Sequence, residues 1–121
     1  MNNSSNAAAD SASQTTGTKV PPVSLSLEEW MIVSKILRHH VPGREVWAYG
    51  SRARGTRLKK YSDLDLAVEG PPLPGLTLSK MADAFDESSL PFKVDIVEAG
   101  SLDPEFRKRI EADRVVLLEP E

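Results

Sequence analysis

Apolar residues recur at helical spacing between residues 26 and 41. Ser26 with Glu29 three residues later has the form of a capping box, which predicts a helix start. Pro42-Gly43 predicts the end of this helix near His40. The pattern therefore indicates an amphipathic helix, with Trp30, Met31 and Leu37 assigned to the core. The residues at helical spacing are Leu27, Trp30, Met31, Ser34, Leu37 and Val41.

Short apolar runs predict strands over residues 45–49, 64–69 and 93–98, and residues 115–118 read as an edge strand. Helices alternate with these strands. A helical turn opens at Ser51, a longer helix covers residues 78–87, and Asp103 caps a last helix with Pro104 in its first turn. The apolar sides of the two longer helices are predicted to be Leu78, Met81, Ala82 and Phe85 in the first, and Phe106 with Ile110 in the second.

The predicted order is α-β-α-β-α-β-α, followed by the edge strand. Strands interleaved with helices favour an α/β or α+β fold, a small mixed sheet flanked by helices. Along residues 64–68, Leu64, Leu66 and Val68 face one side of the sheet, and Asp63 and Asp65 face the other. In the next strand, Asp95 likewise faces the side opposite to its apolar neighbours Val94 and Ile96. The three carboxylates can therefore converge, provided that the two strands are neighbours in suitable register.

Composition divides the 121 residues into a tail and one domain. Residues 1–22 contain no aromatic residue, and Asp10 and Lys19 are their only charged residues, so we predict a disordered tail followed by a domain over 23–121. The chain has no cysteine, which excludes disulfides and thiolate zinc sites. The tail does not resemble a secretory signal, and no apolar run approaches the roughly 20 residues that cross a bilayer. We therefore expect a cytoplasmic protein with no membrane partner.

The net charge of −3 argues against general nucleic-acid binding, so nucleic acid is not expected as a direct partner. Charge is unevenly distributed, however. Basic residues concentrate between residues 44 and 60, beside the acidic residues considered below, which suits a polyanion held by metal and arginine together. This basic patch consists of Arg44, Arg52, Arg54, Arg57, Lys59 and Lys60.

The candidate functional residues lie in Gly50-Ser51, Asp63-Leu64-Asp65 and Asp95. A turn of small residues can hold phosphate oxygens, and carboxylates can hold Mg²⁺ where a phosphoryl bond is broken. Each residue also has a simpler interpretation: Ser51 as a helix cap, Asp63 as a turn residue and Asp65 as an exposed strand residue. Aspartate is disfavoured in strands, so Asp65 and Asp95 inside strong strand patterns favour the functional interpretation.

The segments GSRARG at 50–55, SDLDLAV at 62–68 and VDIV at 94–97 resemble the nucleotidyltransferase superfamily, whose members include DNA polymerase β. They are most similar to its minimal branch, the MNT proteins of prokaryotic HEPN–MNT toxin–antitoxin pairs. The resemblance covers roughly residues 25 to 118 and implies the nucleotidyltransferase fold. Larger members carry a further helical domain. The segment after Asp95 is shorter than such a domain, which implies a pocket that is shallow or completed by another chain.

The resemblance also implies a role for each site residue. Gly50 and Ser51 bind the triphosphate, with Arg52 and Arg54 as further phosphate contacts. Asp63 and Asp65 coordinate Mg²⁺, and Asp95 helps to bind a second ion and accepts the proton of the attacking hydroxyl. The acceptor oxygen attacks the α-phosphorus of ATP, and pyrophosphate departs.

The implied function is that of an antitoxin that transfers AMP from ATP to a tyrosine of a helical HEPN ribonuclease toxin, with which it would assemble. Two alternatives remain open from the sequence. One is a nucleotidyltransferase that acts on a small-molecule hydroxyl, such as that of an aminoglycoside. The other is a catalytically silent antitoxin that blocks its toxin by binding.

Overall fold

The computed structural model describes residues 20–55 and 62–120. The predicted order of elements is confirmed, and the bounds of the strands and of α3 differ from the prediction by at most one residue at either end. The elements in chain order are α1 (Leu27–His40), β2 (Val46–Tyr49), α2 (Ser51–Arg54), β3 (Leu64–Val68), α3 (Thr77–Asp86), β4 (Val94–Glu98), the 3-10 helix η2 (Ala99–Ser101), α4 (Pro104–Asp113) and β5 (Val115–Leu118).

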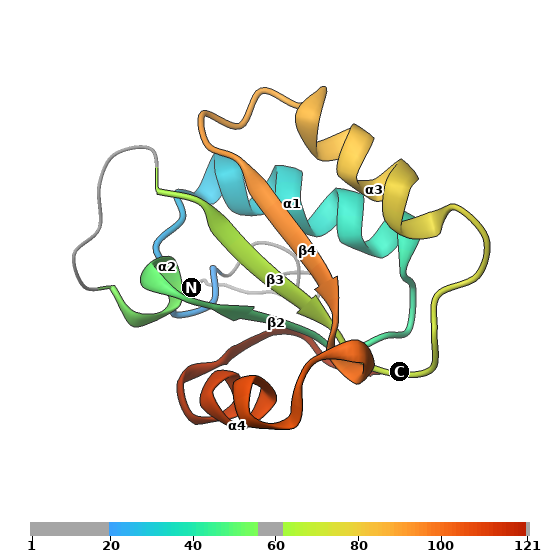
Figure 1. The fold of residues 1–121 in the computed structure, drawn as a ribbon. Coiled ribbons are helices and arrows are strands. Elements are labelled where there is room, and N and C mark those ends of the chain that lie inside the picture. The colour runs from blue at the N-terminus through green and yellow to red at the C-terminus, as the bar shows by residue number, and fades with distance from the viewer. Residues whose placement is uncertain (1–19, 56–61, 121) are drawn as a thin grey trace, which may run out of the picture.

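The strands form one four-stranded sheet in the order β4-β3-β2-β5. β2 runs antiparallel to both β3 and β5, whereas β3 and β4 are parallel, so the predicted mixed sheet is confirmed. β4 and β5 are its edges, which confirms the edge strand expected at 115–118. The parallel pair requires a crossover connection, and α3 provides it on one face of the sheet (Figure 1).

Helices cover both faces of the sheet unequally. α1 and α3 lie together on one face, and α4 lies alone on the other (Figure 1). The main core lies between the sheet and the two-helix layer. A smaller cluster of Trp47, Ala67, Ala99 and Ile110 lies on the α4 side. Alternation along β3 explains this division, because Leu64, Leu66 and Val68 enter the main core while Ala67 enters the smaller cluster.

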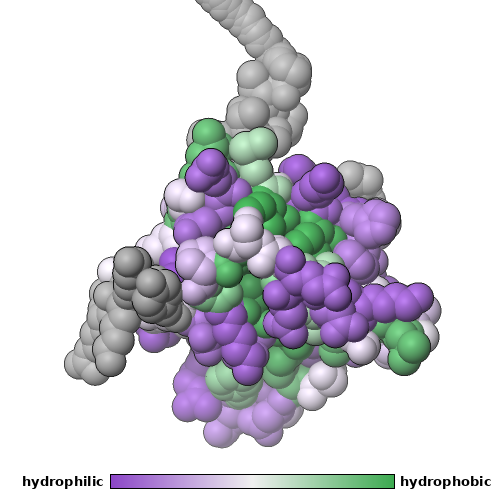
Figure 2. Space-filling model, turned by 90° about the horizontal axis from the view of Figure 1, so that it is seen from above, coloured by the Kyte–Doolittle hydropathy of each residue, from purple (hydrophilic) through white to green (hydrophobic). Residues whose placement is uncertain are grey.

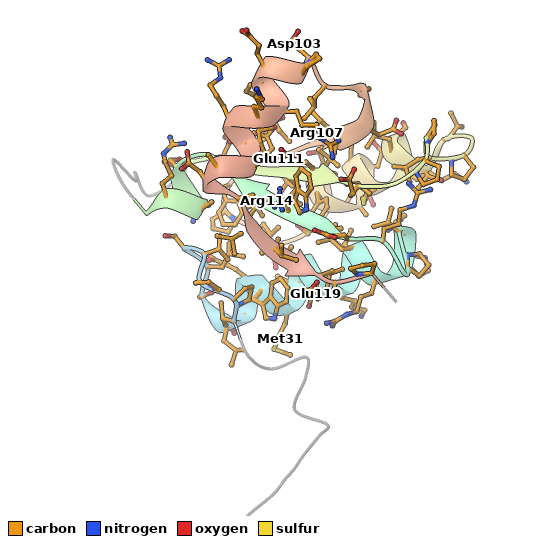
Figure 3. The ribbon with its side chains drawn as sticks, turned by 90° about the horizontal axis from the view of Figure 1, so that it is seen from below. Met31, Asp103, Arg107, Glu111, Arg114 and Glu119 are labelled. Carbon is orange, nitrogen blue, oxygen red and sulfur yellow. The ribbon has the colours of Figure 1, made fainter. Side chains whose placement is uncertain are left out.

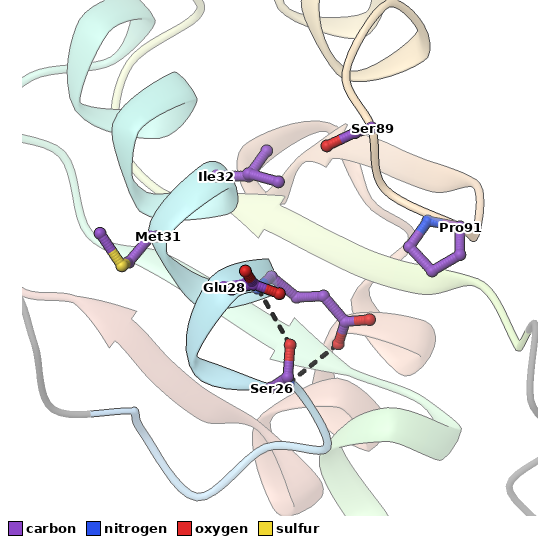
Figure 4. Close-up of a pocket in the computed structure, with 7 residues that line it drawn as sticks. Ser26, Glu28, Met31, Ile32, Ser89 and Pro91 are labelled. Atoms are coloured by element: carbon purple, nitrogen blue, oxygen red, sulfur yellow. Dashed lines mark hydrogen bonds between the residues drawn. The ribbon is translucent and has the colours of Figure 1, made fainter.

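The capping box at the start of α1 is confirmed. The Glu29 amide donates to Ser26 Oγ at 3.1 Å, and the Ser26 amide donates to Glu29 Oε1 at 2.9 Å (Figure 4). The predicted buried stripe is partly wrong, because Leu27 is 49% exposed and Met31 is 53% exposed. Successive helical residues point about 100° apart, and the buried side is centred on other positions, so Met31 turns away from the core. The buried residues are Trp30, Val33, Ser34 and Leu37, with Val41 at the end of the helix.

α4 begins as predicted, since the Asp103 side chain accepts hydrogen bonds from the amides of Glu105 and Phe106. Its apolar side is narrower than predicted, because Ile110 is buried but Phe106 is 37% exposed. The ion pair of Arg107 with Glu69, which follows β3, attaches the helix to the sheet. Arg107 also pairs with Glu111 on its own helix. Figure 3 shows Arg107 and Glu111 along α4, seen from below.

Residues 1–19, most of the predicted tail, lie outside the described residues, as do Arg57, Lys59 and Lys60 of the basic patch. Val20, which the prediction assigned to the tail, is partly buried against the main core. Across residues 20–55 and 62–120, every helix is too short or too polar to cross a membrane.

Candidate active site

A row of three side chains crosses three adjacent strands. Tyr49 of β2 pairs with Asp65 of β3, and Asp65 pairs with Asp95 of β4. Directly paired residues point to the same face, and neighbouring strands lie about 4.8 Å apart. The predicted convergence is therefore confirmed for Asp65 and Asp95, which lie side by side on the face that α4 covers in part.

The carboxylates repel one another within this row. Burial raises the pKa of Asp65, the charges of Asp95 and Asp63 raise it further, and Arg54 partly offsets them. Asp63 is exposed and lies immediately before β3, two residues before Asp65. Burial raises the pKa of the Tyr49 phenol, and the charges of Asp65 and Asp95 raise it further. Acidic charge is thus concentrated at one point of the sheet.

This concentration of charge suits a divalent cation. Mg²⁺ favours carboxylate oxygens, and a bound cation would relieve the repulsion between Asp65 and Asp95. Lys93 compensates only weakly, since its ammonium lies 3.7 Å from Asp95 Oδ1 with both side chains well exposed. In the described parts of the chain, no three Asp, Glu, His or Cys side chains are gathered into a complete metal cage. The donor chemistry fits Mg²⁺, which Asp65 and Asp95 could hold as a pair, with Asp63 beside them.

Gly50 brings the chain close to these carboxylates. Its φ of +79° and ψ of −159° are accessible essentially only to glycine. A Cβ at this position would lie 2.5 Å from Asp65 Oδ2, so a side chain there would force Asp65 or the turn to shift. The turn carries the chain from β2 directly over Asp65 into α2, whose first residue is Ser51. The first amides of a helix lack intrahelical partners and suit an anion such as phosphate.

Arg52, predicted to contact phosphate, instead directs its guanidinium to backbone carbonyls. It is only 5% exposed, its Nε donates to the Ser62 carbonyl at 2.7 Å, and its Nη1 donates to the Ser24 carbonyl at 2.8 Å. Its guanidinium also lies 3.9 Å from the ring centroid of Phe92. We therefore interpret Arg52 as a brace that joins three segments, and Arg54 as the better candidate for phosphate. Arg54 is exposed and close enough to Asp65 to influence its pKa.

Replacing the two arginines should separate these roles. Arg52→Met leaves the partly buried Ser24 and Ser62 carbonyls without this donor, and should lower the free energy of unfolding by about 2–4 kcal/mol. The exposed Arg54→Met should change stability by less than about 0.5 kcal/mol but weaken ATP binding. Urea unfolding and ATP titration of both variants test the assignment. Equal stability of the two variants would contradict the bracing role of Arg52.

The raised pKa of Asp65 predicts a pH-dependent change in stability without metal. A carboxyl group with a higher pKa in the folded protein destabilises it above that pKa, and the penalty disappears as the pH falls below the unfolded value of about 3.9. Asp65→Asn should therefore raise the melting temperature by a few degrees at pH 7 in chelator, and by almost nothing at pH 3.5. Adding Mg²⁺ should stabilise the wild-type chain more than the variant. A variant that is less stable than wild type at pH 7 would contradict this electrostatic account.

Several residues at the site were missed by the sequence analysis. Tyr49 was interpreted only as a strand residue, although it lies next to Gly50 and alternates with Ala48. Phe106 and Arg109 come from α4, and with Tyr49 they line a cavity of about 400 Å³ beside Gly50. Only the sheet register and the packing of α4 reveal this proximity. The side chain of Phe106 was expected in the core, and no sequence signal indicated a site.

Another cavity, of about 430 Å³, lies between the start of α1 and the loop before β4 (Figure 4). Its lining includes Met31, Ile32 and Pro91, but none of the predicted site residues. The surface on the α1 and α3 side is largely hydrophilic, with apolar areas between the charged residues (Figure 2). The arrangement of carboxylates and glycine turn thus distinguishes the α4 side as the candidate active site.

The fold and the site together define a nucleotidyltransferase. Residues 31–117 match the nucleotidyltransferase domain family, and the chain belongs to this family. It is 41% identical over 105 residues to the probable protein adenylyltransferase MntA of Haemophilus influenzae, across 86% of this chain and 91% of that protein. The predicted family is therefore confirmed.

Solved structures share the fold. A toxin–antitoxin crystal structure with AMP-PNP has a TM-score of 0.60 at 24% identity, over 74% of this chain and 73% of that chain. A variant of the toxin–antitoxin complex MntA-HpeT gives a TM-score of 0.61 at 23% identity, over 81% and 76% of the two chains. At these identities the likeness concerns the fold, which is the predicted nucleotidyltransferase fold.

Proposed function

We propose that this chain is a protein adenylyltransferase that uses ATP and Mg²⁺ to modify a tyrosine of a HEPN-type helical toxin, and so acts as its antitoxin. The observation that carries the proposal is the pairing of Asp65 with Asp95 directly beneath the Gly50 turn. The 41% identity to a probable protein adenylyltransferase supports transfer of AMP to a protein. Similarity in fold to toxin–antitoxin structures supports the choice of partner.

Each residue of the site has a role in this proposal. Gly50 lets the backbone approach the triphosphate, and Ser51 with the first amides of α2 binds its β- or γ-phosphate. Arg54 neutralises phosphate charge from the exposed end of α2. Asp63, Asp65 and Asp95 hold Mg²⁺, most simply as two ions. When bound, the metal supplies charge neutralisation for the entering and leaving oxygens.

The proposed transfer forms one bond and breaks one. The tyrosine oxygen bonds to the α-phosphorus of ATP as the bond from that phosphorus to the bridging oxygen of the β-phosphate breaks, and pyrophosphate leaves. Asp95 accepts the phenolic proton, because it lies on the edge strand β4, where the hydroxyl of another protein can come within hydrogen-bond reach of its carboxylate. In-line displacement places the acceptor opposite the leaving pyrophosphate. Because the β- and γ-phosphates are bound at Ser51, which follows β2, the acceptor lies at the Asp95 end of the row.

The position of Asp95 also suits a protein acceptor. β4 is an edge of the sheet, and the side chain of Asp95 is 46% exposed. A tyrosine carried by another protein can reach this edge without entering a deep cavity. The helical toxin would thus provide one wall of the site as well as the acceptor, in an assembly of the two proteins.

Toxin neutralisation in cells distinguishes catalysis from simple binding. Asp63→Asn and Asp65→Asn should each abolish rescue of growth when the proposed HEPN-type toxin is expressed, while the two proteins still co-purify. Full rescue by both variants would instead indicate a silent antitoxin that acts by binding. A wild-type chain that neither binds nor modifies this protein would redirect the search to small-molecule hydroxyls.

A further inference from the structure

The cavity between the sheet and α4 is continuous with the candidate active site. Its volume is about 400 Å³, and its lining includes Tyr49, Gly50, Arg54, Phe106 and Arg109. Gly50 and Arg54 belong also to the proposed phosphate site, and Tyr49 is the β2 member of the row with Asp65. We propose that this cavity holds the base of the bound nucleotide, an inference that rests on the proposed adenylyl transfer.

The walls of the cavity suit a flat ring. Tyr49 and Phe106 meet edge to face, with ring centroids 6.1 Å apart and planes at 86°. Phe106 is 37% exposed, so part of its surface is open to a ligand. The Arg109 guanidinium lies 5.7 Å from the centroid of the Phe106 ring. Aromatic and guanidinium surfaces both stack on nucleobases, and any base offers such a face.

The location argues against the acceptor as the occupant of this cavity. Asp95 lies on β4, and the cavity begins at Tyr49 on β2, two strand spacings or roughly 10 Å away. The acceptor oxygen is expected at the Asp95 end, so the cavity lies on the opposite side of Asp65. A nucleotide with its α-phosphate at the carboxylates can extend its base over this distance.

The charges favour the base over the terminal phosphate. Arg54 and Arg109 could both attract phosphate, but Asp113 also lines the cavity and would repel it. The ring faces of Tyr49 and Phe106 do not favour phosphate, whereas an uncharged flat ring packs well against them. Arg54 is in α2 next to the Gly50 turn, so it can contact phosphate at the mouth while the ring lies deeper against Phe106.

Calorimetric titration with two probes tests the assignment. Phe106→Ala should weaken binding of Mg-ATP by roughly tenfold or more, and leave binding of Mg-tripolyphosphate, which has no base, within about twofold of wild type. Phe106→Trp, which keeps an aromatic face, should retain ATP affinity. Leu76→Ala is the matched control, because Leu76 is another exposed apolar side chain, 69% exposed, at the start of α3 and remote from this cavity.

The outcomes separate this inference from the proposed function. Unchanged ATP affinity in Phe106→Ala would overturn the base site and leave the adenylyltransferase proposal intact. Equal weakening of ATP and tripolyphosphate, or loss of ATP affinity in Phe106→Trp as well, would also overturn it. A folded wild-type chain that binds no Mg-ATP would contradict the proposed function itself. Circular dichroism of each variant verifies that the fold is retained.

Discussion

Asp65→Asn and Asp95→Asn should each reduce the rate of AMP transfer by roughly a thousandfold or more. The two carboxylates are paired across adjacent parallel strands, so each amide replacement removes a negative charge from the position where Mg²⁺ and the α-phosphate would lie. The variants should fold and bind the toxin normally. The measurement is the single-turnover rate of label transfer from ATP at saturating Mg²⁺.

A matched control is available on the opposite face. Asp83 is an exposed aspartate on α3, in the two-helix layer away from the site. Asp83→Asn should transfer AMP at the wild-type rate. If Asp65→Asn retained more than about a tenth of the wild-type rate, the carboxylate pair would not be the catalytic centre.

Gly50→Ala should abolish AMP transfer and also destabilise the fold. The substitution imposes two penalties, a backbone conformation that alanine rarely adopts and a collision of its Cβ with Asp65 Oδ2 at 2.5 Å. The conformational penalty alone is about 1–3 kcal/mol. The collision should displace Asp65 or the turn, and thereby separate the carboxylate from the phosphate site. Urea unfolding and ATP titration measure the two effects.

Gly43→Ala separates strain from collision. Gly43 has a φ of +78°, close to that of Gly50, but its Cβ would meet nothing within 4 Å. Gly43→Ala should lower the free energy of unfolding by about 1–3 kcal/mol, the range expected from backbone strain alone, and should bind ATP normally. Normal ATP binding by Gly50→Ala as well would show that the close approach of the turn to Asp65 is unnecessary.

The sequence predicted those features that depend on local patterns. The capping box at Ser26 and Glu29 involves neighbouring residues, and alternation within β3 and β4 determines which face Asp65 and Asp95 occupy. The pairing of these two aspartates required adjacent strands in suitable register, and adjacency is the usual outcome for a strand–helix–strand connection. The Gly-Ser turn was recognisable because it follows a strand and precedes a helix.

Features that depend on packing between distant segments were not predictable. A basic residue in a short helical turn has the same sequence pattern whether it contacts phosphate or backbone carbonyls, so Arg52 was assigned to phosphate although its guanidinium is buried and bound to carbonyls. Met31 was expected in the core, but the rotation of α1 against the sheet determines its exposure. The contact between Tyr49 and Phe106 depends on how α4 returns across the sheet.

Intact mass spectrometry of the proposed partner, a HEPN-type toxin, tests the central claim most directly. The two purified proteins would be incubated with ATP and Mg²⁺, and the modified residue located by peptide mapping. The account predicts a gain in units of AMP on a tyrosine with the wild-type chain, and no gain with Asp65→Asn. A stable complex whose toxin keeps its unmodified mass, yet is inactive as a ribonuclease, would contradict the account.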